Sequence, residues 1–415
     1  MSNTVMPTAA HFKSLVDRDR LIGRLETLVR SPSENPPGKE AEVAGIVAGY
    51  CEDIGLEVER HEVEPGRPSI IARHRSDGAG GASAGPQPEA GPTLVYCSHI
   101  DVVPAGDPEL WELDPYGADV IEGRMHGRGS SDAKGPVAAA LEAAAILEAS
   151  GVPLEGTLEL ALVADEEAMG FKGAGHLVAQ GILKPDVAII GEPTSLRVVR
   201  AQRGACWLRI ATRGVAGHGS APERGVNAIR HMSEIVLRLE ETLPDISHGV
   251  LGGPSLNVGT IMGGAKVNII PAACLIEVDR RTIPQETEAS VLAGIRAAID
   301  LAKGRFPDLD ARVEAPFFGR AFEIPVDAPV VREVAASVGD AVGREAELIG
   351  FRGASDARFM AEAGADVVVC GPGDISLAHT ARESIDLGEL ERCAVAYALS
   401  FARLLAPGGL EARGA

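Results

Sequence analysis

Three short apolar runs, each ending in histidine or followed closely by acidic residues, most constrain what this chain can fold into. The runs and the polar residues that close them are 93–99 with His99, 157–164 with Glu166 and Glu167, and 186–190 with Glu192. Runs of about four to eight apolar residues, separated by a helical stretch such as 136–149, are typical of buried strands in an α/β sheet. Ligands gather at the carboxyl ends of such strands, so we expect the polar residues to form a site there.

The order of elements changes near residue 200. The sequence predicts strand, helix, two strands, helix and strand, in that order, over residues 206–212, 226–242, 255–261, 273–279, 286–302 and 311–315. This order resembles a small ferredoxin-like sandwich. We therefore predict an α/β protein with an inserted ferredoxin-like α+β domain at 200–315. Residues 1–199 and 316–415 are expected to form the other domain, with a mixed, largely parallel sheet flanked by helices.

Charge and composition exclude several classes of partner. With 59 Asp and Glu against 39 Lys and Arg, the chain carries a formal charge of −20, which repels nucleic acid and anionic membrane surfaces. The apolar runs fall well short of the ~20 residues that span a bilayer, and residues 1–14 lack the apolar core of a signal peptide. We therefore expect a cytoplasmic protein without nucleic-acid or membrane partners. Residues 75–92, rich in Gly, Ala, Ser and Pro, are expected to form a flexible surface loop.

Seven side chains of metal-binding type lie at the predicted strand ends or in loops: His99, Asp101, Asp132, Glu166, Glu167, Glu192 and His379. The six cysteines lie far apart without a CxxC pair, so any metal must be held by histidines and carboxylates. An isolated His-x-Asp pair is more often a hydrogen-bonded strand end, and an adjacent Glu-Glu pair is more often solvated surface. Here both pairs follow apolar runs, where unpaired carboxylates are costly and a cation would offset that cost.

The motifs around these residues follow one unbroken order from His99 to Ile385. They are His99-x-Asp101 with Val102-Val103-Pro104, the glycine-rich segment 127–135, Glu166-Glu167, Glu192-Pro193, the segments 217–222 and 225–229, and Ala378-His379-Thr380. The chain thereby resembles the acetylornithine deacetylase, succinyl-diaminopimelate desuccinylase, aminoacylase and glutamate carboxypeptidase superfamily of di-zinc hydrolases. The resemblance implies a zinc-peptidase-like catalytic domain at 1–199 and 316–415 and a lid or dimerisation domain at 200–315.

The resemblance also implies two divalent metal ions per chain, Zn²⁺ foremost, with Co²⁺ or Mn²⁺ able to substitute. The ligands would be His99 and Glu192 for one ion, Glu167 and His379 for the other, and Asp132 for both. Five ligands on two ions leave open positions, as a catalytic site requires. His126, which precedes the Gly-x-Gly of the segment 127–135, is expected to be a loop residue rather than a ligand.

Three further residues receive catalytic roles from the resemblance. Asp101 would orient the imidazole of His99 and raise its basicity. Glu166 would act as the general base toward a metal-bridged water or hydroxide and pass the proton to the leaving amine. His218 would stabilise the oxyanion in the active site of a neighbouring subunit, which implies a homodimer.

Four residues are candidates for binding the substrate. Asn268 and Arg281 match lid positions that hold the substrate's carboxylate in relatives, a task suited to a guanidinium. Arg280 is the alternative to Arg281, because the side chains of a strand alternate and only one of the two can point inward; we favour Arg281. Asp356 and Arg358 lie in a segment that resembles one near the substrate, with a structural ion pair as the alternative.

The leading functional prediction is a metal-dependent amidohydrolase that removes an acyl group from an N-acyl amino acid or a related amine. A dipeptidase or carboxypeptidase of the same superfamily is the alternative, because motifs do not reveal the lid residues that distinguish acyl groups. A non-catalytic, metal-stabilised binding module is a weaker alternative, since no structural metal site needs Glu166 or His218.

Overall fold

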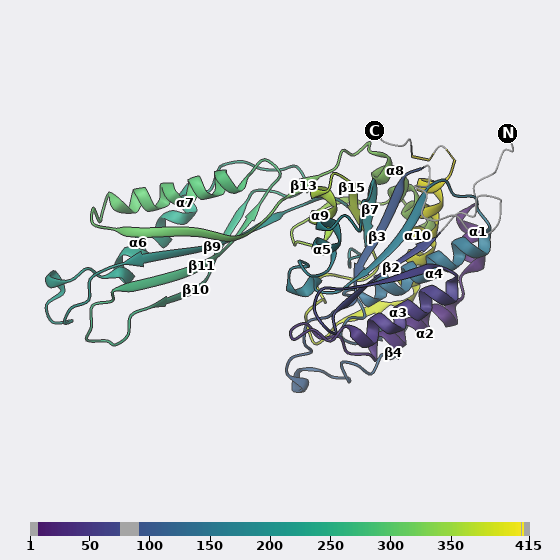
Figure 1. Ribbon diagram of the computed structural model, residues 1–415, viewed down its shortest axis with the longest axis horizontal. Helices are drawn as coiled ribbons and strands as arrows, with labels where there is room; N and C mark the ends of the chain where they lie inside the picture. The colour runs from purple at the N-terminus through teal and green to yellow at the C-terminus, as the bar shows by residue number, and fades with distance from the viewer. Residues whose placement is uncertain (1–6, 75–90, 408, 411–415) are drawn as a thin grey trace. The chain divides into compact units, whose positions relative to one another are not determined.

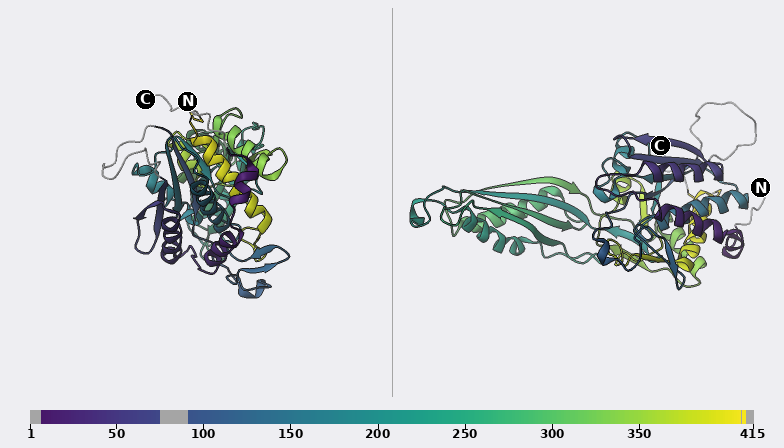
Figure 2. Two further views of the ribbon diagram at one scale, coloured as in Figure 1. Left: turned by 90° about the vertical axis from the view of Figure 1, so that its right-hand side faces the viewer. Right: turned by 90° about the horizontal axis from the view of Figure 1, so that it is seen from below.

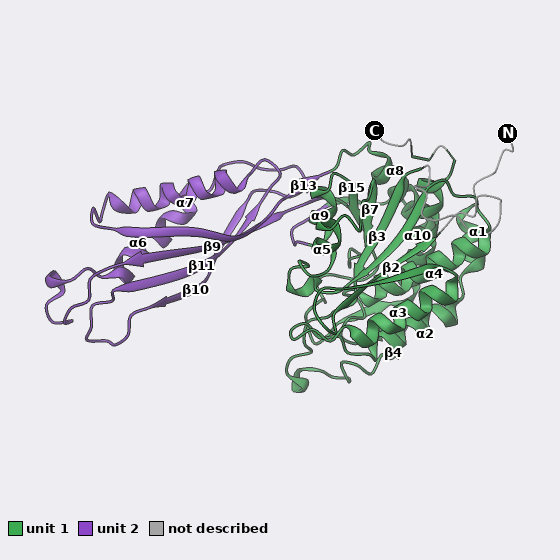
Figure 3. Ribbon diagram, viewed as in Figure 1, with its two compact units in different colours: residues 1–200, 324–349, 355–415 green, residues 201–323, 350–354 purple. Residues whose placement is uncertain are grey.

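The computed structural model describes residues 7–74, 91–407 and 409–410, so the loop expected at 75–92 lies outside the described residues apart from its last two. The chain divides into two compact units (Figure 3). Unit 1 comprises residues 1–200, 324–349 and 355–415, and unit 2 comprises residues 201–323 and 350–354. The inserted unit therefore runs to residue 323, whereas the sequence pattern placed its end at residue 315.

A mixed sheet with a parallel centre forms the core of unit 1 (Figure 1). Its order is β1-β2-β6-β3-β7-β15-β8-β13, with β14 paired to β8. β3 is parallel to β6 and β7, and β15 is parallel to β7, whereas β1 and β2 are antiparallel additions at one side. The strands are β1 (Glu57–Glu62), β2 (Pro68–His74), β3 (Thr93–His99), β6 (Thr157–Val163), β7 (Val187–Ile190), β8 (Val198–Gln202), β13 (Phe322–Glu323), β14 (Leu348–Phe351) and β15 (Asp366–Val369).

Two groups of helices flank this sheet. The larger group is α1 (Ala9–Leu15), α2 (Arg18–Val29), α3 (Ala41–Ile54), α4 (Lys134–Ser150), α8 (Pro329–Val342) and α10 (Leu387–Leu405), and the smaller is α5 (Ala174–Ala179) with α9 (Ala357–Glu362). The alanine-rich helix α4 is buried along most of its length and packs against β3 and α10, because its small side chains allow close approach. α4 thereby fixes the loop before it, which carries Asp132.

A second, three-stranded sheet in unit 1 has the order β16-β5-β4. Its strands are β4 (Asp119–Ile121), β5 (Arg124–His126) and β16 (Ser384–Asp386). His126 lies on β5, paired with Ser384 on β16, so the prediction of a loop position for His126 was wrong. The sequence of residues 124–126 gave no strand signal. Each strand of this sheet has only three residues, which is too short to show an alternating pattern of apolar and polar side chains.

Unit 2 is a four-stranded antiparallel sheet with two helices packed on it, seen from two directions in Figures 1 and 2. The order is β10-β11-β9-β12, with β9 (Gly204–Arg213), β10 (Ser255–Gly263), β11 (Ala273–Thr282) and β12 (Asp310–Gly319). The helices are α6 (Ala228–Leu239) and α7 (Glu288–Lys303). β11 alternates strictly between buried and more exposed residues, as expected for a sheet with one face covered.

Side-chain caps mark where both helices of unit 2 begin. The side chain of Asn227 accepts the backbone N–H of Arg230 at 3.0 Å, and Thr287 and Ser290 form a reciprocal capping box at the start of α7. The helices and the sheet enclose an apolar core that includes Ile210, Ile235 and Ile276.

The predicted fold class, an α/β domain plus an inserted α+β unit, is confirmed. In the part of the chain that the structure describes, we find no helix with the length and apolarity needed to cross a membrane, and all six cysteines are buried and unpaired.

Candidate metal centre

The carboxyl ends of β3, β6 and β7 meet at one edge of the sheet of unit 1. β3 pairs in register with β6 up to His99 and Val163, and both strands end there. The chain leaves β6 through a short turn that carries Glu166 and Glu167, and it leaves β7 through Gly191 into Glu192. Parallel pairing thus places the polar residues that follow the three predicted strands at a common edge.

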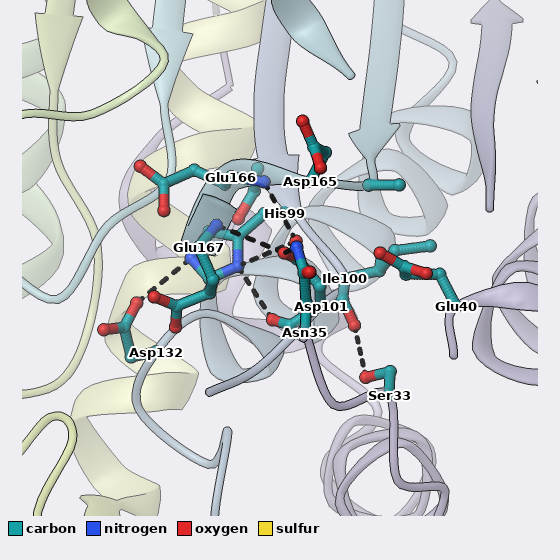
Figure 4. Close-up of polar contacts among 12 residues, drawn as sticks. Ser33, Asn35, Glu40, His99, Ile100, Asp101, Asp132, Asp165, Glu166 and Glu167 are labelled. Carbon is teal, nitrogen blue, oxygen red and sulfur yellow. Dashed lines mark hydrogen bonds and ion pairs between the residues drawn. The ribbon is translucent and has the colours of Figure 1, made fainter. Parts of the chain in front are cut away.

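Two histidines and two carboxylates contact one another at this edge; three of them, His99, Asp132 and Glu167, are labelled in Figure 4. His99 Nε2 lies 3.1 Å from Asp132 Oδ1, and His379 Nε2 lies 3.4 Å from Asp132 Oδ2 and 3.1 Å from Glu167 Oε2. Each oxygen of Asp132 therefore faces a different histidine. One possible ligand atom from each of His99, Asp132 and Glu167 lies within 4.8 Å of the other two. This is the arrangement expected when one carboxylate serves two cations.

His379 reaches the cluster from the turn before β16, and its backbone is strained. Its φ is +61°, in the left-handed region that residues other than glycine rarely adopt. Such conformations persist where the surrounding structure over-determines them, and they cluster at functional sites. Its side chain is 54% exposed, whereas His99 is 1% exposed, so His379 forms the open side of the cluster.

Glu192 and Glu166 add negative charge to the same region. Burial raises the pKa of Glu192 well above its usual range, and the charges of Asp132, Asp356 and Glu167 raise it further. Burial likewise raises the pKa of Glu166, with Glu192 as the largest charge acting on it. Carboxylates gathered at this density beside two histidines are a donor set that suits divalent cations. The residues present therefore fit a two-metal centre.

Hydrogen bonds to Asp101 fix both a histidine and the glutamate turn. His99 Nδ1 lies 2.9 Å from the backbone carbonyl of Asp101 and 3.6 Å from its carboxylate, so Nδ1 donates to that carbonyl and Nε2 is the ring atom that faces the cluster. The Asp101 carboxylate accepts Nδ2–H of Asn35 at 2.8 Å and the backbone N–H groups of Glu166 and Glu167 at 3.2 and 3.1 Å. Although burial alone would raise the pKa of Asp101, these contacts and His99 lower it.

Glu383 fixes the loop that carries Asp132. Its carboxylate accepts the backbone N–H groups of Ser131 and Asp132, each at 3.1 Å, and pairs with the guanidinium of Arg128. Arg128 in turn lies over the ring of Trp111, with 5.3 Å between the guanidinium carbon and the ring centre. Glu383 follows His379 by four residues, so one segment supplies a candidate ligand and the support for another.

Asp356 and Arg358 are both buried, and the charge of Arg358 opposes the rise in the pKa of Asp356 that burial causes. Both carboxylate oxygens of Asp356 are buried without a hydrogen-bond partner, and burial raises the pKa of this group to about 6. Arg358 donates to the backbone carbonyls of Met169 and Ser355, and its guanidinium carbon lies 4.4 Å from the ring centre of Phe359. Arg358 thus holds the chain just after the Glu166-Glu167 turn.

In unit 2, the structure brings His218 and Asn268 together. Residues 218 and 269 form an isolated β-bridge, and Gly219 N–H donates to the carbonyl of Asn268 at 2.9 Å. His218 Nδ1 accepts the backbone N–H of Ser220 at 3.2 Å, so a neutral His218 carries its proton on Nε2. Both His218 and Asn268 are exposed. His218 therefore presents a hydrogen-bond donor on the surface of unit 2.

Arg280 and Arg281 point to opposite faces of β11. Arg280 is 3% exposed and pairs with Glu286, which is also buried, and burial lowers its pKa. Arg281 pairs with Asp279 at 3.0 Å, and its side chain is 30% exposed. Arg281 is the one of the two whose guanidinium remains accessible.

Comparisons with known proteins agree with this geometry. Residues 95–403 match the peptidase family M20/M25/M40. The chain is 36% identical over 373 residues to the acetylornithine deacetylase of Myxococcus xanthus, covering 87% of this chain and 89% of that protein. It is 32% identical over 357 residues to the acetylornithine deacetylase of Proteus mirabilis, covering 83% and 85%. The chain belongs to peptidase family M20/M25/M40.

Solved structures of M20 proteins share the fold. An aminopeptidase of Bacillus cereus superposes with a TM-score of 0.74 at 23% identity, covering 94% of this chain and all of that one. A dinuclear metal-binding M20 peptidase of Bacillus subtilis superposes with a TM-score of 0.71 at 16% identity, covering 94% and 98%. This M20 chain is thus a metal-dependent amidohydrolase, a hydrolase of amide or peptide bonds, and the resemblance inferred from its motifs is confirmed.

The sequence pattern indicated the residues of the cluster in this M20 chain but not the residues that support them. Asn35 and Glu383 were missed as functional residues. Glu383 had a signal, because it ends the segment 378–383 whose histidine was assigned. Asn35 had no such signal. It lies in a segment of turn-forming residues, and its partner Asp101 is 66 residues away in the sequence. The roles predicted for the individual site residues remain predictions.

Proposed function

We propose that this chain hydrolyses the amide bond of an N-acyl amino acid by means of two divalent metal ions, Zn²⁺ in the first instance. The observation that carries the proposal is the position of Asp132 between His99 and His379, with Glu167 beside it. In this proposal Glu192 completes the ligands of the ion on His99, and Glu167 those of the ion on His379. Bound ions would supply Lewis acidity toward the scissile carbonyl and the attacking water.

Glu166 is the proposed general base. It is adjacent to Glu167 in a turn at the edge of the cluster, and in this proposal it accepts a proton from water and then gives it to the leaving amine nitrogen. Its backbone N–H is held by Asp101 at 3.2 Å, which limits the positions that its carboxylate can take. Two adjacent glutamates would thereby serve different tasks, ligation and proton transfer.

Unit 2 is proposed to act as the lid and dimerisation domain. His218 Nε2–H would donate to the oxyanion, and Arg281 with Asn268 would bind the substrate's carboxylate. The edge strand β10 carries the exposed side chains of Ile261 and Met262, followed by the fully exposed Val267. An apolar unpaired edge of this kind favours pairing with a second copy of the chain, so a homodimer stays our prediction.

N-acetylornithine is the first substrate to test. The relatives that are 30–36% identical over more than four fifths of the chain are named acetylornithine deacetylases. The dipeptidases and aminopeptidases that share the fold are less than 25% identical and support only the architecture. A dipeptidase or carboxypeptidase remains the second candidate, and a cytoplasmic location also remains a prediction.

A substrate panel tests the proposal. The chain, loaded with Zn²⁺, Co²⁺ or Mn²⁺, is assayed on N-acetyl and N-succinyl amino acids, on dipeptides and on peptides with a free carboxyl end. The proposal expects faster release of acetate or succinate than of free amino acid from dipeptides. Faster cleavage of dipeptides would select the second candidate, and no hydrolysis of any member by fully loaded protein would refute both.

A further inference from the structure

A buried arginine, Arg67, contacts Asp165, the residue just before the turn that carries Glu166 and Glu167. Arg67, which precedes β2, is 7% exposed. Its Nη2 lies 2.7 Å from Oε1 of Glu40 and 2.9 Å from Oδ1 of Asp165, and its Nε lies 3.1 Å from the same Glu40 oxygen. One guanidinium therefore bridges two buried carboxylates from segments more than 100 residues apart. Figure 4 labels both carboxylates, Glu40 and Asp165.

Asp165 is the residue from which the Glu166-Glu167 turn begins. Its φ is +75°, a left-handed conformation that aspartate tolerates better than most residues. Its carbonyl accepts Gly170 N–H at 2.6 Å, and its Oδ2 accepts Lys172 N–H at 2.9 Å. The other oxygen of the same carboxylate faces Arg67. Asp165 therefore closes the turn on itself and ties it to Arg67.

The segment before α3 anchors the other side of Arg67. Glu40 is fully buried, and the nearby Gly38 leaves the room that the guanidinium needs, because a Cβ there would lie 2.2 Å from Arg67 Nε. Gly38 also has a φ of +95°, which disfavours any other residue. The same segment supplies Asn35, which holds Asp101. Two routes, Asn35 through Asp101 and Glu40 through Arg67, thus converge on one turn.

Charge balance makes Arg67 hard to replace. Without the guanidinium, the carboxylates of Glu40 and Asp165 would both be buried and uncompensated, which is far more costly than losing an exposed ion pair. Burial already raises the pKa of Glu40, and Arg67 opposes that rise. Glu40, Asp165 and Arg67 therefore depend on one another for their positions.

We propose that Arg67 is a positioning residue that holds the Glu166-Glu167 turn in place through Asp165. The inference rests on the proposed function, in which Glu166 is the general base. Arg67 contacts the carboxylates of Glu40, Glu64 and Asp165, none of which is a candidate metal ligand. Its effect is therefore expected on the placement of Glu166 rather than on the affinity for substrate. Supports of this kind typically change activity or metal affinity by about 10- to 100-fold.

Arg73, which lies on β2 itself, is the control. It also bridges two carboxylates, with Nε 2.6 Å from Glu159 and Nη1 2.6 Å from Glu59. Glu159 lies near the start of β6, away from the turn that follows the strand's end. Arg73→Met therefore removes a comparable ion-pair bridge from β2 without disturbing the turn.

The first readout does not depend on catalysis. Hydrogen exchange is measured over residues 164–170 in the wild type, Arg67→Met, Arg67→Lys and Arg73→Met, each as the full chain loaded with Zn²⁺. We expect faster exchange of the Glu166 and Glu167 amides in Arg67→Met, partial recovery in Arg67→Lys, and wild-type exchange in Arg73→Met. Equal exchange in Arg67→Met and Arg73→Met would overturn the inference.

Kinetics separate this inference from the proposed function. At full metal occupancy, Arg67→Met is expected to lose about 10- to 100-fold in kcat with KM within about twofold of wild type, whereas Arg73→Met keeps its kcat. Asp165→Asn should lose a similar factor, and the double variant should lose little more than either single one. Wild-type kcat in Arg67→Met would contradict the positioning role.

The proposed function fails in a different way. An inactive wild type, or a fully active Glu166→Gln, would refute the proposed function, while the exchange measurement would still decide the role of Arg67. Should Arg67→Met not fold, Arg67→Lys and Asp165→Asn carry the test.

Discussion

The candidate residues of unit 1 and those of unit 2 are held in opposite ways. In unit 1, His99 and Asp132 are 1% and 6% exposed, and each contacts another member of the cluster. In unit 2, His218 and Asn268 are exposed and meet through backbone hydrogen bonds, and Arg281 is 30% exposed. Contacts within unit 1 hold the residues of the first group in place. The second group lies at the surface of its unit, where Arg281 is also paired with Asp279.

The two groups therefore differ in what a substitution should change. A cluster whose carboxylates are buried near one another is pre-organised for cations, so its substitutions should be detectable without substrate. Exposed donors act only when a substrate or another chain reaches them. Substitutions in unit 2 should therefore leave the metals unchanged and alter kcat or KM alone.

Removing the metals should have the largest effect on turnover, because the buried cluster of unit 1 is the group proposed to bind them. Dialysis against a chelator is expected to abolish turnover, with Zn²⁺, Co²⁺ or Mn²⁺ restoring it, because imidazole and carboxylate ligands suit all three. Metal analysis should find two ions per chain in the restored protein. Asp132→Asn should bind both ions poorly, since Asp132 faces both histidines. Full activity in protein shown to contain no metal would contradict the two-metal proposal.

The next largest effect should come from Glu166→Gln. We expect it to keep both metals and to lose ~10²–10⁴-fold in kcat, the range for losing general acid–base catalysis. Its matched control is Glu167→Gln, which should bind the metal on His379 poorly because Glu167 lies 3.1 Å from His379 Nε2. Metal content and kcat of the two variants, measured side by side, check both roles. Swapped effects would reverse the assignment of base and ligand.

His218→Ala should have a smaller effect and should test whether unit 2 serves another chain. It is expected to bind two metals and to lose ~10²–10³-fold in kcat, the scale for one oxyanion donor. Mixing it with Glu166→Gln should restore activity, because one site of a mixed dimer combines an intact Glu166 with the partner's intact donor. Random exchange gives roughly half mixed dimers with one good site of two, hence roughly a quarter of wild-type activity. Mass measurement shows whether subunits have exchanged. If they have exchanged and activity is still not restored, His218 acts in the site of its own chain.

The sequence predicted the cluster but not what holds it, and the reason is physical. A buried strand followed by acidic residues leaves a local pattern, and parallel pairing then brings such ends together without further information. Supports such as Asn35, Arg67 and Glu383 come from loops and strand edges far from their partners in the chain. Arg128 and Glu383, for example, lie 255 residues apart. Their contacts depend on how segments pack, which no local pattern encodes.

The same limit applies to details within the predicted site. The resemblance assigned the orientation of His99 to the carboxylate of Asp101. His99 Nδ1 lies 3.6 Å from that carboxylate and 2.9 Å from the backbone carbonyl of the same residue. The carboxylate also accepts the backbone N–H groups of Glu166 and Glu167, which the sequence did not indicate. Alternation along β11 separated Arg280 from Arg281, but which face is covered follows from the packing of α6 and α7.

The two arginines of β11 give the smallest and most local test of the contrast between buried and exposed groups. Arg281→Met should raise KM by about 10- to 100-fold, since a charge-assisted hydrogen bond contributes roughly 1.5–3 kcal/mol, and should leave the free energy of unfolding nearly unchanged. Arg280→Met should do the reverse, because it leaves Glu286 buried and unpaired, which typically costs ~3–5 kcal/mol of stability. Denaturant unfolding and steady-state kinetics on both variants check this. If Arg280→Met folds stably and raises KM more than Arg281→Met does, Arg280 binds the substrate's carboxylate, and the buried ion pair with Glu286 must then open when substrate enters.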